Sequence, residues 1–120
     1  MDLIEKKISS EEIFNGRILH VRRDTVRLPN GGEAFREVVD HPGGVCILAL
    51  DSQNRALLVS QFRYPYEEVL RELPAGKLEY GEDPREAAIR ELKEETGAVA
   101  GEFRSLGELY PSPGYCGEII

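Results

Sequence analysis

Short runs of alternating apolar and polar residues fill the N-terminal part of the chain, and this pattern predicts strands there. Residues 17–28 and 34–40 carry β-branched residues in partial alternation. The Pro-Asn-Gly-Gly sequence at residues 29–32 is typical of a tight turn. We therefore predict a β-hairpin over residues 17–40. Residues 3–14 alternate poorly and fit a leading strand or an irregular arm.

A second group of strands is predicted after the Pro-Gly-Gly break at residues 42–44. Residues 45–50 form a continuous apolar run, which predicts a strand buried on both faces. Residues 56–62 are its predicted antiparallel mate. Two further short strands are predicted at residues 70–73 and 77–80.

One helix is predicted over residues 84–96. Asp83 provides an N-cap, Pro84 occupies the first helical position, and Glu86 completes a capping box. Gly97 is the expected residue just past the C-terminus. The side of the helix predicted to be apolar comprises Ala88, Ile89, Leu92 and Thr96.

The order of these elements predicts an α/β (α+β) fold in which a mixed β-sheet is layered with helix. An N-terminal antiparallel hairpin arm precedes this core. Residues 98–120 are predicted as a strand followed by a loop. A length of 120 residues predicts a single domain over residues 1–120, with the arm at residues 1–42 and the core at residues 43–120.

The charge balance restricts the class of partner. Fifteen Lys and Arg residues against 22 Asp and Glu give a formal charge of −7, which argues against a nucleic-acid partner. No apolar run approaches the ~18 residues of a membrane span, and the first residues lack the apolar region of a signal peptide. The two cysteines, Cys46 and Cys116, lack disulfide or zinc spacing. We expect a cytoplasmic protein that has no contact with membranes.

Three carboxylates crowd one sector of the predicted helix. Glu91 lies three and four residues before Glu94 and Glu95, and like charges at these spacings cost roughly 0.2–0.5 kcal/mol per pair. The cluster is locally unfavourable unless a cation sits against it. A hard divalent ion that prefers oxygen ligands, Mg²⁺ first, fits carboxylates without His or Cys. The alternative is an ordinary solvated helix face, which the spacing alone favours.

A longer pattern around these carboxylates resembles the Nudix box. Gly76 is followed by five residues, Glu82, seven residues, Arg90-Glu91-Leu92, one residue, Glu94-Glu95, one residue and Gly97-Ala98. The match covers every specified polar and glycine position. Ala98 departs from it slightly, because a larger aliphatic residue is usual there.

The resemblance to Nudix hydrolases implies a metal site on a loop–helix–loop. By this resemblance Glu91 and Glu95 are direct ligands, and Glu94 binds directly or through water. The carbonyl of Ala75 points at the metal, where Gly76 permits a tight backbone turn. Glu82 and Arg90 correspond to the family's structural pair. The expected metal-binding residues are Ala75, Glu91, Glu94 and Glu95, and the three glutamates are also the expected catalytic residues.

Segments outside the box are similar to the ADP-ribose pyrophosphatase branch of this family. Pro113 lies 15 residues past Ala98, which is the spacing that distinguishes this branch. The similarity extends over roughly residues 14–120 and is carried by residues 28–31, 36–43, 61–65, 72–76 and 112–118.

This branch implies a set of substrate contacts. Arg63 would contact the diphosphate or the terminal ribose, and Arg36 with Glu37 would reach the adenosine end, in the opposite subunit of a dimer. Ordinary strand charges are the alternative for Arg36 and Glu37. The expected substrate-binding residues are Arg36, Glu37, Arg63, Glu72, Pro113, Gly114 and Glu118.

The resulting hypothesis is Mg²⁺-dependent hydrolysis of a nucleoside diphosphate derivative. Mn²⁺ is the alternative ion, and ADP-ribose is the expected substrate, giving AMP and ribose 5-phosphate. Two alternatives are a non-catalytic or weakly active nucleotide-binding Nudix module and a nucleoside-triphosphate pyrophosphatase, which Pro113 disfavours.

Two further expectations concern the chain's extent and its assembly. Enzymes of this branch continue past the position of Ile120 with strands, a helix and a loop that supplies a glutamate base. We therefore expect a C-terminally truncated chain, in which no general base is assigned. A homodimer through the 17–40 hairpin is expected, because this arm is too small to bury its own faces.

Overall fold

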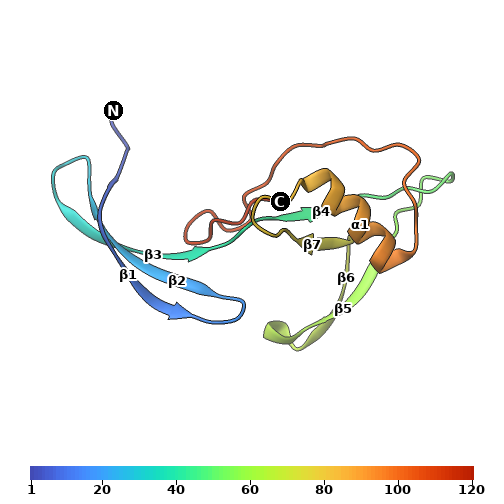
Figure 1. Ribbon diagram of the computed structural model, residues 1–120, viewed down its shortest axis with the longest axis horizontal. Coiled ribbons are helices and arrows are strands. Elements are labelled where there is room, and N and C mark those ends of the chain that lie inside the picture. The colour runs from blue at the N-terminus through green and yellow to red at the C-terminus, as the bar shows by residue number, and fades with distance from the viewer. The chain divides into compact units, whose positions relative to one another are not determined.

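Three antiparallel strands form the N-terminal part of the computed structural model, which describes residues 1–120 (Figure 1). They are β1 (Lys6–Asn15), β2 (His20–Arg27) and β3 (Glu33–Asp40), in the order β1-β2-β3. Contacts divide the chain into two units. Residues 1–42 and 110–119 form the N-terminal unit, and residues 43–109 with Ile120 form the second unit.

The predicted hairpin is confirmed by the pairing of β2 with β3, from His20 opposite Asp40 to Arg27 opposite Glu33. Its turn is closed by the Leu28 N–H, which donates to the Gly32 carbonyl at 2.8 Å. Gly31 has a φ of 88°, a backbone conformation that explains glycine at this position. The leading segment also forms a strand, because β1 pairs with β2 through two register shifts.

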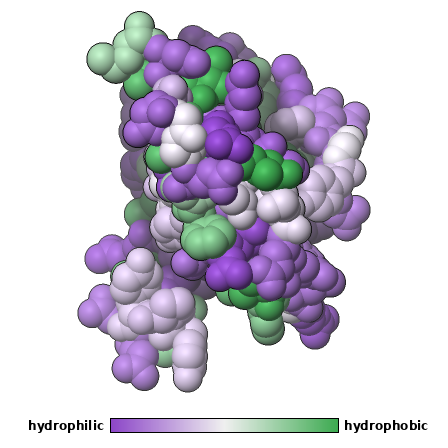
Figure 2. Space-filling view, turned by 90° about the vertical axis from the view of Figure 1, so that its left-hand side faces the viewer, coloured by the Kyte–Doolittle hydropathy of each residue, from purple (hydrophilic) through white to green (hydrophobic).

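Val26 is the only buried apolar residue in the three strands of the N-terminal sheet, and several polar side chains form pairs there. Every residue of β1 is exposed. Asp24 is buried and accepts a hydrogen bond of 2.6 Å from the Ser10 hydroxyl. Arg23 pairs with Glu11 across the strands at 2.7 Å. The face in Figure 2 is accordingly mostly hydrophilic, with apolar residues in small separate patches.

Residues 110–119 add no regular strand to this sheet. The Val39 N–H donates to the Tyr115 carbonyl at 2.7 Å and the Gly117 N–H donates to the Val39 carbonyl at 3.0 Å, giving a single parallel bridge between Val39 and Cys116. Pro111 and Pro113 lack the N–H donors that a regular ladder needs. Residues 98–109, where a strand is predicted ahead of this loop, form no regular strand either, so that prediction is wrong.

The second unit contains two strand pairs and one helix. β4 (Gly44–Cys46) pairs antiparallel with β7 (Ala75–Lys77), and β5 (Val59–Arg63) pairs antiparallel with β6 (Glu68–Glu72). A 3₁₀ turn at Tyr64–Tyr66 joins β5 to β6. The predicted 70–73 strand overlaps β6, whereas the predicted 77–80 strand shares only Lys77 with β7 and is therefore misplaced.

The apolar run at residues 45–50 is buried on one face only, which corrects the prediction of a strand buried on both faces. Val45 and Ile47 are buried, whereas Cys46, Leu48 and Leu50 are exposed. Residues 45–50 and their predicted partner strand at residues 56–62 share only one bridge, between Leu50 and Ala56, and one hydrogen bond beside it. Antiparallel sheets commonly cover a single face, and the pairing partner of β4 is β7.

The helix α1 (Pro84–Thr96) begins and ends where the sequence predicts. The Asp83 side chain accepts a hydrogen bond from the Arg85 N–H at 2.9 Å. Gly97 has a φ of 73°, and its N–H donates to the Lys93 carbonyl. The helix has 13 residues and is too short to span a membrane.

The buried face of α1 packs on β4 and holds the core of the second unit. Ala87, Ala88 and Leu92 cluster with Val45 and Ile47. Ile89, which the helical pattern places on the apolar side, is 42% exposed, and Ala87 is buried instead. The buried face of the helix is therefore rotated toward Ala87 relative to the face that the sequence predicts.

We predict that Leu92→Ala lowers the free energy of unfolding by about 2–5 kcal/mol, because Leu92 is 3% exposed and its removal leaves a cavity. Ile89→Ala on the same helix is the matched control and should cost less than about 1 kcal/mol. Urea denaturation of both variants measures the difference. Equal losses would contradict this assignment of the core.

Candidate active site

Glu91 lies directly against the backbone of β7. A Cβ placed on Gly76 would overlap the carboxyl group and the Cγ atom of Glu91. Gly76 is held opposite Val45 by the β4–β7 pairing, and Glu91 projects from the central part of α1. Only glycine leaves room for this approach, which brings a carboxylate beside the 75–76 backbone.

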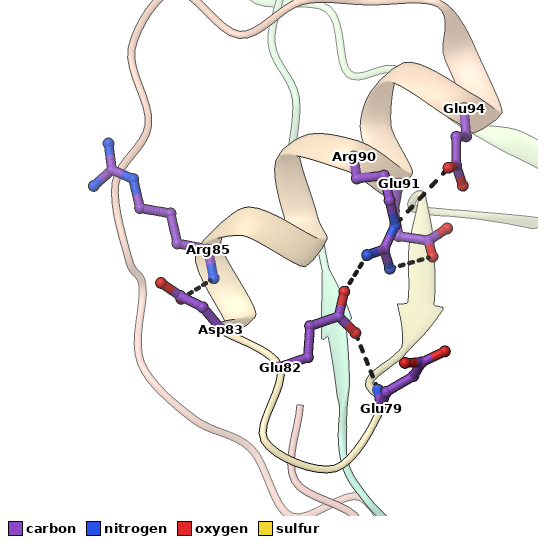
Figure 3. A network of polar contacts seen from close by, with 7 residues as sticks. All are labelled: Glu79, Glu82, Asp83, Arg85, Arg90, Glu91 and Glu94. Atoms are coloured by element: carbon purple, nitrogen blue, oxygen red, sulfur yellow. Dashed lines mark hydrogen bonds and ion pairs between the residues drawn. The ribbon is translucent and has the colours of Figure 1, made fainter.

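Arg90 is the cation beside the helix carboxylates (Figure 3). Its guanidinium forms an ion pair with Glu82 and lies 3.4 Å from Glu91 and 3.8 Å from Glu94. The pKa of Arg90 is raised, chiefly by the hydrogen bond to Glu82. In this arrangement Arg90 offsets part of the charge repulsion among the carboxylates.

Glu82 ties the loop before the helix to the helix itself. Besides the pair with Arg90, its carboxylate accepts a hydrogen bond from the Glu79 N–H at 3.0 Å (Figure 3). The hydrogen bond from Arg90 lowers the pKa of Glu82, and the Glu79 N–H contributes in the same direction. The pairing of Glu82 with Arg90 that the Nudix resemblance implies is confirmed by these contacts.

The donor set suits a hard cation that keeps part of its water shell. Within residues 1–120 no three acidic, His or Cys side chains converge to form a metal site by themselves. Glu91 approaches the β7 backbone, while the Glu94 side chain is 60% exposed and Glu95 is exposed. Mg²⁺ is commonly held by one or two carboxylates together with waters and substrate phosphates. The residues present fit that kind of binding.

Arg63 and Glu72 form a second charged pair, on the β5–β6 hairpin. The Arg63 Nε–H donates to Glu72 Oε2 at 2.7 Å, and Nη2–H donates to Oε1 at 2.5 Å. These bonds are the main cause of the raised pKa of Arg63, to which the charge of Glu95 also contributes. They likewise lower the pKa of Glu72. The pair therefore lies within electrostatic reach of a helix carboxylate.

The other predicted substrate residues belong to the N-terminal unit. Arg36 donates two hydrogen bonds to Glu5, at 2.9 and 2.6 Å, which raise the pKa of Arg36. Glu37 lies opposite Arg23 in the sheet. Glu118 lies 3.8 Å from His41. Pro113 and Gly114 are exposed in a turn of the C-terminal segment.

Glu5 was missed by reasoning from the sequence. It is the hydrogen-bonding partner of Arg36, although 31 residues separate the two. The sequence around Glu5 carries no motif, and only the pairing of β1 with β2 brings the N-terminus near β3.

Comparison with protein families identifies both parts of the chain. Residues 40–118 match the family described as "NUDIX domain". Residues 5–39 match the family described as "Nucleoside diphosphate sugar hydrolase N-terminal domain". The first match covers the helix, its carboxylates and the Arg63–Glu72 pair.

Curated relatives match nearly the whole chain. The "ADP-ribose pyrophosphatase" of Bacillus subtilis is 45% identical over 98% of this chain and 64% of its own length. The "Methanol dehydrogenase activator" of Bacillus methanolicus is 47% identical over 97% of this chain and 63% of its own length. The chain thus spans less than two thirds of the length of these relatives.

A solved structure supports the fold. The chain described as "Crystal structure of ADP compounds hydrolase" superimposes with a TM-score of 0.85, covering 99% of this chain and 65% of the other chain. Its sequence identity is 23%, so this likeness bears on the fold alone. The predicted α/β class with a hairpin arm is confirmed.

We predict that Glu82→Gln destabilises the protein at neutral pH and that the loss shrinks in acid. Arg90 lowers the pKa of Glu82 in the folded state. The ionised Glu82 carboxylate therefore stabilises the fold fully above the unfolded pKa of about 4.3. The stabilisation is lost as the pH falls through the folded pKa. Urea denaturation at several pH values measures the gap between variant and wild type.

Glu79→Gln is the control for this measurement, because it removes a carboxylate from the same loop while the Glu79 N–H bond to Glu82 remains. A Glu82→Gln loss that persists unchanged well below pH 4, roughly the unfolded pKa, would contradict the ion pair with Arg90.

Proposed function

The chain belongs to the Nudix hydrolase family, and from this premise we propose that it acts in the hydrolysis of a nucleoside diphosphate derivative. ADP-ribose is the proposed substrate, with AMP and ribose 5-phosphate as products. The observation that supports this most strongly is the Glu91 carboxylate held against the glycine of β7. The "ADP-ribose pyrophosphatase" relatives at 45% identity support the choice of substrate.

A divalent cation at the α1 carboxylates is part of the proposal, with Mg²⁺ as the ion and Mn²⁺ as the alternative. Glu91 and Glu95 would hold it, together with the Ala75 carbonyl, and Glu94 would contribute directly or through water. When bound, the ion supplies charge neutralisation for the diphosphate and acidifies a water molecule. Arg90, now close to Glu91 and Glu94, limits repulsion among these groups.

Substrate contacts are proposed for Arg63 of the β5–β6 hairpin, for a pair of residues on β3 and for the C-terminal segment. Arg63 would stabilise negative charge on the departing phosphate. Glu72 would line the pocket beside Arg63. Arg36 and Glu37 would contact the adenosine end, in a homodimer formed through the N-terminal hairpin. The proposed C-terminal contributors are Pro113, Gly114 and Glu118.

Assembly and location complete the proposal. The exposed β1 edge and the few buried apolar residues of the N-terminal sheet support a homodimer. A stable monomer in sedimentation at micromolar concentration would contradict it. We propose that the chain acts as a single functional domain in the cytoplasm. Cell fractionation that finds the protein in another compartment would contradict this location.

A nucleotide-binding module of little or no catalytic power is the second candidate. It is favoured by the ion pairs of Arg90 with Glu91 and Glu94 and by the absence, within residues 1–120, of three converging ligand side chains. Such a module would bind ADP-ribose without releasing AMP.

We predict that the chain with Mg²⁺ releases AMP from ADP-ribose faster than it hydrolyses 8-oxo-dGTP. Chromatographic measurement of AMP, with calorimetry of ADP-ribose binding in parallel, tests this. Binding without AMP release would select the binding module, and faster hydrolysis of 8-oxo-dGTP would select a nucleoside-triphosphate pyrophosphatase.

We predict that Gly76→Ala weakens Mg²⁺ binding by at least about tenfold, because the new Cβ displaces the Glu91 carboxyl from the β7 backbone. Gly101→Ala is the matched control, since a Cβ there meets open space. Calorimetric titration with Mg²⁺ measures the affinity, and circular dichroism checks that α1 persists. Unchanged Mg²⁺ affinity in a folded Gly76→Ala variant would contradict the proposed site.

A further inference from the structure

The partner that Arg63 selects is not the nearest carboxylate in the strand register. Arg63 lies directly opposite Glu68 in the β5–β6 pairing, whereas Glu72 lies opposite Val59, four positions along β6. Directly opposed residues in an antiparallel pair are the natural cross-strand partners. The guanidinium nevertheless donates two hydrogen bonds to Glu72. Its side chain therefore runs back along the hairpin, away from the Tyr64–Tyr66 turn.

The hydrogen bonds to Glu72 leave most of the guanidinium available. Arginine carries five N–H donors, and Glu72 accepts only the Nε–H and one from Nη2. Both hydrogens of Nη1 and the second of Nη2 remain on the outer edge, which suits a planar contact with phosphate oxygens. The ion pair orients this edge without covering it.

The surroundings of the pair argue against a direct contact between Glu72 and the diphosphate. Both Glu72 oxygens are engaged by Arg63, and the Glu72 side chain is 22% exposed against 44% for Arg63. A carboxylate facing a diphosphate would also add repulsion between like charges. The charge of Glu95 acts on Arg63, so the paired guanidinium lies within electrostatic reach of one of the proposed metal-binding carboxylates.

We propose that Glu72 is a positioning residue, which holds the Arg63 guanidinium near the α1 carboxylates and prevents its capture by Glu68. This inference rests on the proposed function, because the diphosphate is the group that the free edge of Arg63 would meet. Glu72 then acts on substrate binding only through Arg63.

Calorimetric titration of ADP-ribose with Mg²⁺ into Glu72→Gln and Glu68→Gln tests the proposal. Glu72→Gln should weaken binding by about tenfold, because an amide cannot accept both charged hydrogen bonds. Glu68→Gln is the matched control, with one carboxylate removed from the same strand face, and should stay within about twofold of wild type. Equal effects of the two variants, or none from Glu72→Gln, would overturn the role of Glu72.

An Arg63→Lys background separates positioning from direct contact. Lysine cannot make the two-bond pair, so adding Glu72→Gln to Arg63→Lys should change the affinity by less than about twofold. An undiminished tenfold loss in that background would mean that Glu72 contacts the substrate itself and would overturn the proposal.

A measurement without ligand separates this inference from the proposed function. The Arg63 Nε–H resonance in ¹⁵N NMR spectra should shift in Glu72→Gln and stay in place in Glu68→Gln. No shift in Glu72→Gln would overturn the proposal whatever binds. A shift as expected, with no ADP-ribose binding by the unchanged chain, would instead contradict the proposed function.

Discussion

The close approach of Glu91 to the β7 backbone is the constraint on which the rest of the site depends. It requires glycine at position 76, the pairing of β4 with β7 and the packing of α1 on β4. The core residue Leu92 directly follows Glu91 in the sequence, and the core residue Val45 pairs with Gly76. Packing in the core therefore fixes the spacing between a carboxylate and a backbone segment, and this spacing is what a small cation would use.

Charge balance is the second constraint. The protein is acidic, with a formal charge of −7, and its helix carries carboxylates at spacings that repel. Two arginines offset this locally. Arg90 contacts three carboxylates around the helix, and Arg63 is held by Glu72 within reach of Glu95. A divalent ion and an arginine with free donors would each reduce the repulsion that a diphosphate meets at such a surface.

Local signals in the sequence predicted the features that depend on local interactions. Asp83, Pro84 and Gly97 fix the ends of α1, and the turn at residues 29–32 fixes the hairpin. The features that were not predicted from the sequence depend on contacts between residues that are far apart in the chain. One-sided burial of residues 45–50 follows from the packing of α1 on Val45 and Ile47, and the partner of Arg36 is Glu5. The resemblance to the Nudix box predicted the Glu82–Arg90 pair, whereas the choice of Glu72 over Glu68 by Arg63 needed the strand register.

In the proposed site, the α1 carboxylates and the glycine bend together grip a divalent ion against a diphosphate. The most direct measurement is a crystal structure of the chain with Mg²⁺ and ADP-ribose. We expect the ion to be bound by oxygens of Glu91 and Glu95 and by the Ala75 carbonyl, with diphosphate oxygens completing its shell. An ion bound elsewhere, or a diphosphate seated with no ion near Glu91, would contradict it.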